Sequence, residues 1–325
     1  MGKSPDKAPP RIGGQAIIEG VMMRSPQRIS AVVRLPSGEM TSKVWESVAW
    51  FRRHKLLGLP IVRGAVSLAE ALVLGVRTLN WSADMALEEE RKARSEEKKK
   101  SDSLGLTLTL IVAFVLAIGL FMLVPYQIAS LLKTDRNQPL FHLVAGSTRI
   151  IFFLVYLWAI SRLKDIRRVF EYHGAEHQSI YCYEKGEPLE GDSVRRQSRF
   201  HPRCGTSFLL ITALLVMAIF VLFDIAVVAI WGAYSNAFVR FLVHLPFLPL
   251  VAGISYEVLR LSDRFSDSGI VKALIAPGLA LQRLTTRLPD DSQREVAIES
   301  IHLALGTKAS PAASAEPDYP AAVNM

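Results

Sequence analysis

Apolar and polar positions fall into long separate blocks along this chain, and several apolar blocks are long enough to cross a bilayer. Residues 104–132 contain no charged side chain, and a membrane-spanning helix needs roughly 20 apolar residues. The fourth apolar block contains His244, Pro246 and Pro249, which predict a broken or re-entrant helix because proline cannot donate a backbone hydrogen bond. We predict four spans, at about 104–131, 143–162, 206–230 and 238–256.

The first 100 residues follow a different pattern, with short runs typical of β-strands and one long helix. Runs 29–35 and 40–45 flank the turn residues 36–39, and this arrangement predicts a hairpin. Another strand is predicted at 16–18. A helix is predicted over 59–81, and because both of its flanks are basic we expect it to lie at the cytosolic membrane surface.

Two more helices are predicted in polar segments. One follows directly from the second span over 163–181 and ends at 185–188, and the other covers 290–305 with Asp290 or Asp291 as its cap. Apolar residues and two histidines form a single stripe on the first of these helices. The stripe contains Leu163, Ile166, Phe170, His173, His177 and Ile180.

These patterns predict a mainly α integral membrane protein with about four transmembrane helices and a small N-terminal α+β cytosolic region. Half of the residues are hydrophobic and the mean hydropathy is +0.26. The expected organisation is a disordered N-terminus at 1–11, a cytosolic α+β region at 12–100, a transmembrane domain at 101–257 with a cytosolic loop at 163–205, C-terminal cytosolic helices at 258–306 and a disordered tail at 307–325.

The distribution of basic residues predicts the membrane topology. The net charge is +8, and 18 of the 38 lysines and arginines precede Leu104, 9 lie in 162–203 and 7 follow Tyr256. Alternating spans put these three groups on one side, and basic loops stay cytoplasmic. We therefore expect a multi-pass protein of the bacterial inner membrane with both termini in the cytosol. No apolar leader is visible in 1–11, so a cleaved signal peptide is not expected.

Nucleic-acid binding is not expected, because the chain has no basic stripe interleaved with aromatic side chains. The lipid bilayer and a membrane-associated substrate are the expected partners. The oligomeric state has no signature in the sequence.

Two short motifs carry the candidate chemistry, and they flank the start of the third predicted span. Residues 171–177 read Glu-Tyr-His-Gly-Ala-Glu-His, and residues 201–205 read His-Pro-Arg-Cys-Gly. Histidines four apart on a helix share one face, where a zinc-type ion can bridge them. The candidate metal ligands are His173, His177, His201 and Cys204.

Glu176 is the candidate catalytic base, because the order His-x-x-Glu-His places a carboxylate beside the second histidine, as in inverted zincins. Glu171, Glu19 and Arg24 are candidates to orient the ligands. Mixed histidine and cysteine ligation favours Zn²⁺, whereas histidine and glutamate alone would also suit iron or manganese. The plainer alternative is that the two histidines are hydrogen-bonded core residues.

The sequence leaves three function classes open. The first is a membrane-embedded, metal-dependent enzyme, of the zinc hydrolase type, with its site at the cytosolic membrane face. The second is a membrane scaffold or regulatory protein with a structural zinc site. The third is a small transporter that uses Asp224, Arg149 and the broken fourth span.

Several blocks resemble the DUF1385 family, also called YqhQ-like proteins. They are residues 13–24, 79–83, 171–177, 201–208, 253–257 and 277–287. The resemblance covers roughly 12–305 and implies a bacterial integral membrane protein that is a metal-dependent enzyme without an assigned reaction. It implies His173, His177, His201 and Cys204 as ligands, with Glu176 as base. Gln178 and Leu288 depart from the expected pattern, where a basic residue and a glutamate are expected.

Overall fold

The protein is mostly helical, with a small antiparallel sheet near its N-terminus. The structure is a computed structural model. It describes residues 10–94, 119–131, 139–265 and 268–308, except 48, 53, 233, 235 and 236, together with the isolated residues 108, 112, 115 and 116.

The sheet is a meander of four strands in the order β1-β2-β3-β4, with every neighbouring pair antiparallel. The strands are β1 (Gly13–Ile17), β2 (Gly20–Arg24), β3 (Arg28–Arg34) and β4 (Met40–Glu46). Strand β1 and the β3–β4 hairpin confirm the predicted strands. The sequence pattern did not predict β2 as a strand, because its first four residues are all buried and show no polar alternation.

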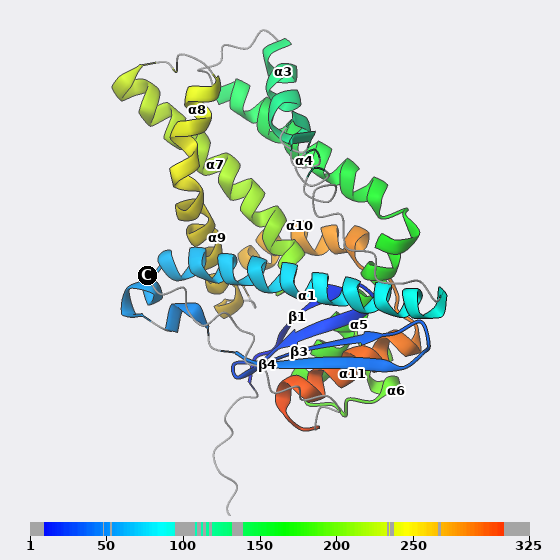
Figure 1. The fold of residues 1–325 in the computed structure, drawn as a ribbon. Coiled ribbons are helices and arrows are strands. Elements are labelled where there is room, and N and C mark those ends of the chain that lie inside the picture. The colour runs from blue at the N-terminus through cyan, green and yellow to red at the C-terminus, as the bar shows by residue number, and fades with distance from the viewer. Residues whose placement is uncertain are drawn as a thin grey trace, which may run out of the picture.

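Helices cover both faces of the sheet. Helix α1 (Val62–Arg94) lies on one face, where Leu74 packs against a cluster that includes Ile17 and Ile29. The other face is covered by α5 (Lys164–Glu184) and α11 (Asp291–Leu305), which belong to one apolar core with β2 and β3 (Figure 1). That core contains Val21, Met23, Val32, Tyr172, Ala175, Val296 and Ile301.

Helix α11 begins where the sequence predicted, with Asp290 as its N-cap. The Asp290 carboxylate accepts a hydrogen bond from the backbone N–H of Gln293, and the Gln293 side chain accepts one from the backbone N–H of Asp290. This reciprocal pair satisfies two backbone donors at the helix start. Gly306 ends the helix in the left-handed conformation, with φ 72°.

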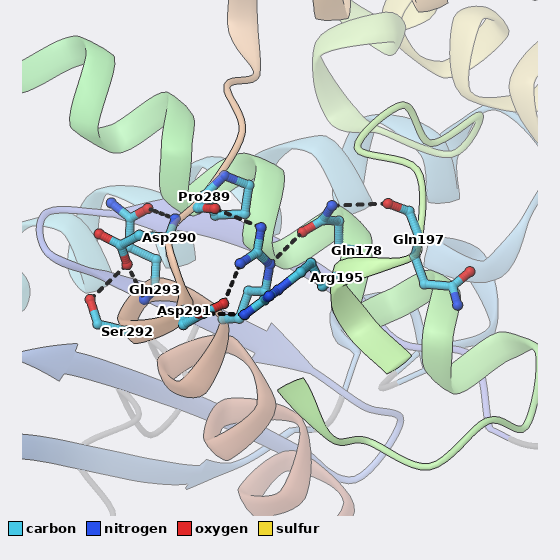
Figure 2. Close-up of polar contacts among 9 residues, drawn as sticks. Gln178, Arg195, Gln197, Pro289, Asp290, Asp291, Ser292 and Gln293 are labelled. Carbon is cyan, nitrogen blue, oxygen red and sulfur yellow. Dashed lines mark hydrogen bonds and ion pairs between the residues drawn. The ribbon is translucent and has the colours of Figure 1, made fainter. Parts of the chain in front are cut away.

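A buried polar network joins α11 to α5 and to the segment after α6 (Gly191–Arg195). Gln178 of α5 donates a hydrogen bond to the carbonyl of Gln197 (Figure 2) and accepts one from Arg294. Arg294 also donates to Asp291 and to the carbonyl of Pro289. Gln178, noted above as a departure from the expected family pattern, is therefore a buried bridge between three segments.

Two helices, α4 (Pro139–Ile160) and α7 (Gly205–Trp231), contain windows long and apolar enough to span a membrane. These windows, Leu143–Ile160 and Thr212–Trp231, have 11% and 6% of their residues buried inside the protein. The core helix of a soluble protein would be mostly buried, so this exposure favours contact with lipid. The two helices match the second and third predicted spans.

The other two predicted spans are not confirmed. Much of the first half of the first predicted span lies outside the described residues, and its second half contains a π-helical turn, η3 (Gly119–Leu123), and α3 (Val124–Leu131). The fourth is divided into α8 (Ala237–His244), the 3-10 turn η4 (Leu245–Phe247) and α9 (Leu248–Arg264). The break falls at the prolines, as the sequence predicted.

The predicted continuation of the second span into 163–181 is wrong. Helix α4 ends at Ile160, the chain turns through 161–163, and α5 begins at Lys164. After this turn the C-terminal part of the stripe, with His173, His177 and Ile180, is buried, whereas Leu163 at its start is 57% exposed. Periodicity predicted the stripe but gives no information on the direction of a helix relative to its predecessor.

Helix α1 lies between the sheet and the apolar helices (Figure 1). It is longer than the predicted 59–81 and is preceded by two 3-10 turns, η1 (Trp50–Arg52) and η2 (Lys55–Gly58). Gly64 of α1 and Gly253 of α9 let the two helices cross closely, because a Cβ on Gly64 would lie 2.9 Å from the Gly253 Cα. Helix α10 (Gly269–Thr285) packs on α7 and leads the chain back to the sheet domain.

Candidate metal centre

Three side chains from the two predicted motifs come together in the protein interior. His173 and His177 lie one turn apart on α5, and Cys204 immediately precedes α7. One ligand atom from each residue lies within 4.8 Å of the other two, and all three residues are buried. The imidazole centroids are 4.4 Å apart. Two nitrogens and one sulfur at this spacing form a donor set suited to a metal ion.

Backbone carbonyls orient both imidazoles. The Nδ1 of His173 lies 2.8 Å from the carbonyl oxygen of Thr285, and the Nδ1 of His177 lies 2.5 Å from that of Arg199. A carbonyl oxygen only accepts, so each Nδ1 donates its proton and each neutral ring presents Nε2 as a lone pair. Metal-binding histidines are held in this way, with the second ring nitrogen donating to a carbonyl or carboxylate.

The Nε2 atom of His177 is buried and forms no hydrogen bond of good geometry within the part of the chain that the structure describes, although the Cys204 thiol lies beside it. Leaving such an atom unsatisfied costs about 1–3 kcal/mol. Burial lowers the pKa of His177 below its ordinary value and so favours the neutral ring, although a contact with Cys204 opposes this effect. A metal ion at this position would satisfy the unpaired nitrogen. The residues therefore fit a metal.

The imidazole of His173 faces the thiol of Cys204. The Nε2 of His173 lies 3.2 Å from the Sγ of Cys204, within hydrogen-bond distance for sulfur. Cys204 is 8% exposed, and its thiol is not part of a disulfide. Thiolate and neutral imidazole are the ligands that zinc prefers, and both can form here by loss of the shared proton.

Glu176 is buried next to this group. Burial raises the pKa of its carboxyl to about 8; the charge of His173 acts in the opposite direction and that of Cys204 in the same direction. The side chain lies against strand β1, because a Cβ built on Gly14 would come within 2.7 Å of the Glu176 Oε1. The glycine at position 14 therefore leaves the room that the carboxyl group occupies.

His201 lies beside the group but is not part of it. Its ring is 5.7 Å from that of His177, while its Nε2 lies 3.3 Å from a Glu184 carboxylate oxygen. Its Nδ1 accepts a hydrogen bond from the backbone N–H of Arg203. The structure thus brings together three of the four predicted ligands, and a ligand role for His201 stays a prediction.

The three predicted supporting residues lie in other contacts. Glu171 accepts hydrogen bonds from Arg167 and Gln293. Glu19 pairs with Arg168 and accepts from the Tyr172 hydroxyl. Arg24 forms an ion pair with the buried Glu70 and also contacts Ser47. Their contacts join elements of the fold around the site, and their role in orienting the ligands stays a prediction.

Sequence reasoning missed the groups that orient the imidazoles. The carbonyls of Thr285 and Arg199 lie 112 and 22 positions from the histidines they contact. Every residue has a carbonyl, so no residue type marks this role. Only the resemblance of the 277–287 block gave a sign that this segment mattered.

Asp224, the residue of the transporter alternative, lies far along α7 and is 1% exposed. Arg240 forms an ion pair with it, the Tyr234 hydroxyl donates to it, and the Nε2 of His244 lies 3.1 Å away. Its charge is therefore compensated by groups from α8 and the segment before it. This arrangement joins α7 to the broken helix.

Comparison with known proteins agrees with the motifs on which the site is built. The model of the family described as "Protein of unknown function (DUF1385)" matches residues 59–307. This chain belongs to the DUF1385 family. It is 34% identical over 319 residues to the "Uncharacterized protein YqhQ" of Bacillus subtilis (strain 168), covering 92% of this chain and 93% of that protein. No solved structure matches this DUF1385 chain.

Proposed function

We propose that this DUF1385 protein is a membrane-embedded zinc hydrolase whose site faces the cytosol. The observation that carries the proposal is the buried group of His173, His177 and Cys204, whose ligand atoms lie within 4.8 Å of one another and in which the Nε2 of His177 forms no hydrogen bond of good geometry with the described residues. Buried polar atoms are nearly always paired, and an unpaired one calls for an explanation such as an ion.

The donor set supports zinc over other metals. Two imidazoles and a thiolate suit zinc, whereas magnesium, calcium and manganese prefer oxygen ligands. Three protein ligands leave a fourth position open, which is typical of catalytic sites, while structural sites are closed by four. Bound zinc would supply Lewis acidity, which lowers the pKa of water and polarises a substrate carbonyl or phosphoryl oxygen.

Glu176 is the proposed proton carrier. Burial raises the pKa of its carboxyl, and a group whose pKa lies near the working pH can both take up and release a proton. It belongs to the same helix turn as His177 and is buried beside the ligand group. In this proposal His173 and His177 bind the zinc, the carbonyls of Thr285 and Arg199 hold the two imidazole rings in place, and the surrounding core excludes water.

The membrane location rests on the two apolar helices and on the distribution of charge. Cys204 directly precedes α7, so the metal centre lies at one end of a helix able to span a bilayer. The segments before and after the centre are basic, and basic segments stay on the cytoplasmic side. Both observations support a site at the cytosolic membrane face.

Metal content of the detergent-purified protein tests the proposal. We expect about one zinc per chain by mass spectrometry, and loss of that zinc in His173→Ala/His177→Ala. The matched control is His54→Ala/His302→Ala, which removes two histidines outside the group and should keep the zinc. Absence of metal in freshly purified, unchelated wild-type protein would overturn the proposal.

Glu176→Gln separates catalysis from a structural zinc site. We expect this variant to keep its zinc and its melting temperature. When it is expressed in a deletion strain, we expect the mass spectrum of the membrane extract to remain that of the deletion strain and not to return to that of the wild type. If Glu176→Gln restores the wild-type extract while loss of zinc unfolds the protein, the structural alternative is correct.

A further inference from the structure

A cavity of about 480 Å³ lies next to the metal centre, between the sheet and α1. Its volume is within the range of small-molecule sites, roughly 300–1,000 Å³. Met22 of β2 and Leu74 of α1 form part of its apolar wall, and Gly13 and Gly14 of β1 lie along one side.

Four arginines line this cavity: Arg11, Arg24, Arg52 and Arg203. They come from four separate parts of the fold, namely the segment before β1, strand β2, the turn η1 and the motif before α7. Among the described residues, no aspartate or glutamate is part of the lining. Arg24 and Arg203 also form ion pairs, with Glu70 and Glu184, which lie outside the lining. The cavity thus presents guanidinium donors on an apolar background.

Two features connect the cavity to the metal centre. Gly14 lines the cavity and lies close to Glu176, since a Cβ built on Gly14 would lie 2.7 Å from Oε1 of that carboxyl. Arg203 lines the cavity as well and is the immediate neighbour of Cys204 in the chain. The cavity thus borders two segments of the metal centre, whereas Glu176 and the proposed ligands are not part of its lining.

We propose that this cavity binds a phosphoryl group of the substrate; calling the ligand a substrate rests on the proposed function above. Arginine presents a planar fork of donors that matches phosphate and carboxylate oxygens. A carboxylate has two oxygens and one charge, whereas a phosphomonoester has three acceptor oxygens and close to two charges. Guanidinium donors that come from four parts of the fold, two of them on arginines already paired with a carboxylate, suit the three-oxygen acceptor better. The apolar wall takes the uncharged part of the same molecule.

The phosphoryl group can come from a phospholipid head group or from a water-soluble phosphomonoester. Calorimetric titration of the detergent-purified full-length protein with inorganic phosphate, dihexanoyl phosphatidic acid and acetate distinguishes these sources. We expect saturable binding of phosphate and no binding of acetate. Tighter binding of the short-chain phosphatidic acid supports a lipid source, and equal binding supports a soluble one.

Arg11→Gln/Arg52→Gln is the decisive variant, because both side chains are exposed and their replacement leaves the Arg24–Glu70 ion pair intact. We expect phosphate affinity to fall at least about tenfold. Arg52→Glu alone should weaken it further than Arg52→Gln alone. The matched control is Arg167→Gln/Arg195→Gln, which removes the same charge at two exposed arginines outside the cavity and should change nothing.

Zinc content measured in the same samples keeps the two proposals apart. Loss of phosphate binding with zinc retained in Arg11→Gln/Arg52→Gln supports the cavity as a separate binding element. Phosphate binding by a wild-type protein that holds no zinc would overturn the hydrolase and leave the cavity as a phosphate site. Binding of acetate as tight as phosphate, no phosphate binding at all, or an equal loss in the control variant would overturn the phosphoryl proposal.

Discussion

Gly174 lies so close to the carbonyl oxygen of Arg287 that no Cβ fits between them. This contact lets α5 approach the segment after α10, and the backbone N–H of Arg287 donates to the carbonyl of Phe170 at 2.8 Å. The same approach brings the carbonyl of Thr285 to the Nδ1 of His173. A glycine between the two histidines thus determines how one of them is oriented.

Gly174→Ala is expected to destabilise the protein by about 1–3 kcal/mol, because the added methyl group must displace backbone. It should also lower the zinc content, since displacement of 285–287 removes the acceptor for His173. Melting temperature and metal content measure the two effects. Gly191→Ala is the control, because a Cβ there meets nothing within 4 Å. Equal behaviour of the two variants would contradict the packing argument.

Gln178 is expected to tolerate only groups that accept a hydrogen bond from Arg294. Gln178→Ala should cost about 1–3 kcal/mol, because it leaves buried partners unpaired. Gln178→Lys should cost more than Gln178→Glu, because the lysine would face the guanidinium of Arg294 at the position where Gln178 now accepts its hydrogen bond. Melting temperatures of the three variants measure this order. Gln27→Ala, at an exposed turn position, is the control.

Asp291 is expected to contribute to the acid sensitivity of the fold. Hydrogen bonds from Arg195 and Arg294 lower the pKa of its carboxyl below the ordinary 3.8. The folded state therefore favours the charged form, so this stabilisation is present above the ordinary pKa and is lost as the pH falls through the lowered pKa. Asp291→Asn should show a smaller drop in melting temperature below pH 4 than wild type. The exposed Asp84→Asn should keep the full drop.

Asp224 and Arg240 are expected to depend on each other. Asp224→Asn should destabilise by about 3–5 kcal/mol, because it removes the charge of the buried carboxylate that pairs with Arg240. Asp224→Asn/Arg240→Gln should be less destabilised than the sum of its two single variants. A double-mutant cycle on thermal unfolding in detergent measures this coupling. Additive losses would mean that the pair contributes no joint stabilisation.

Local patterns predicted much of the fold correctly. The capping residue Asp290, the β3–β4 hairpin and the helical stripe with His173 and His177 depend on interactions between residues a few positions apart. Such interactions are encoded in spacing and residue type. Residue type and the position of both motifs before the third predicted span made Cys204 a candidate ligand, but they did not give its distance from the histidines.

Other features depend on contacts between distant segments, and spacing does not encode them. Cys204 lies within the ligand group. His201 lies beside the group, where Glu184 and the Arg203 N–H contact its two ring nitrogens. The cavity of arginines likewise exists only where β1, β2, η1 and the 201–205 motif meet. The sequence therefore predicted which types of metal-binding side chain are present. Tertiary packing decided which donors converge, because it alone sets side-chain direction between segments more than 100 residues apart.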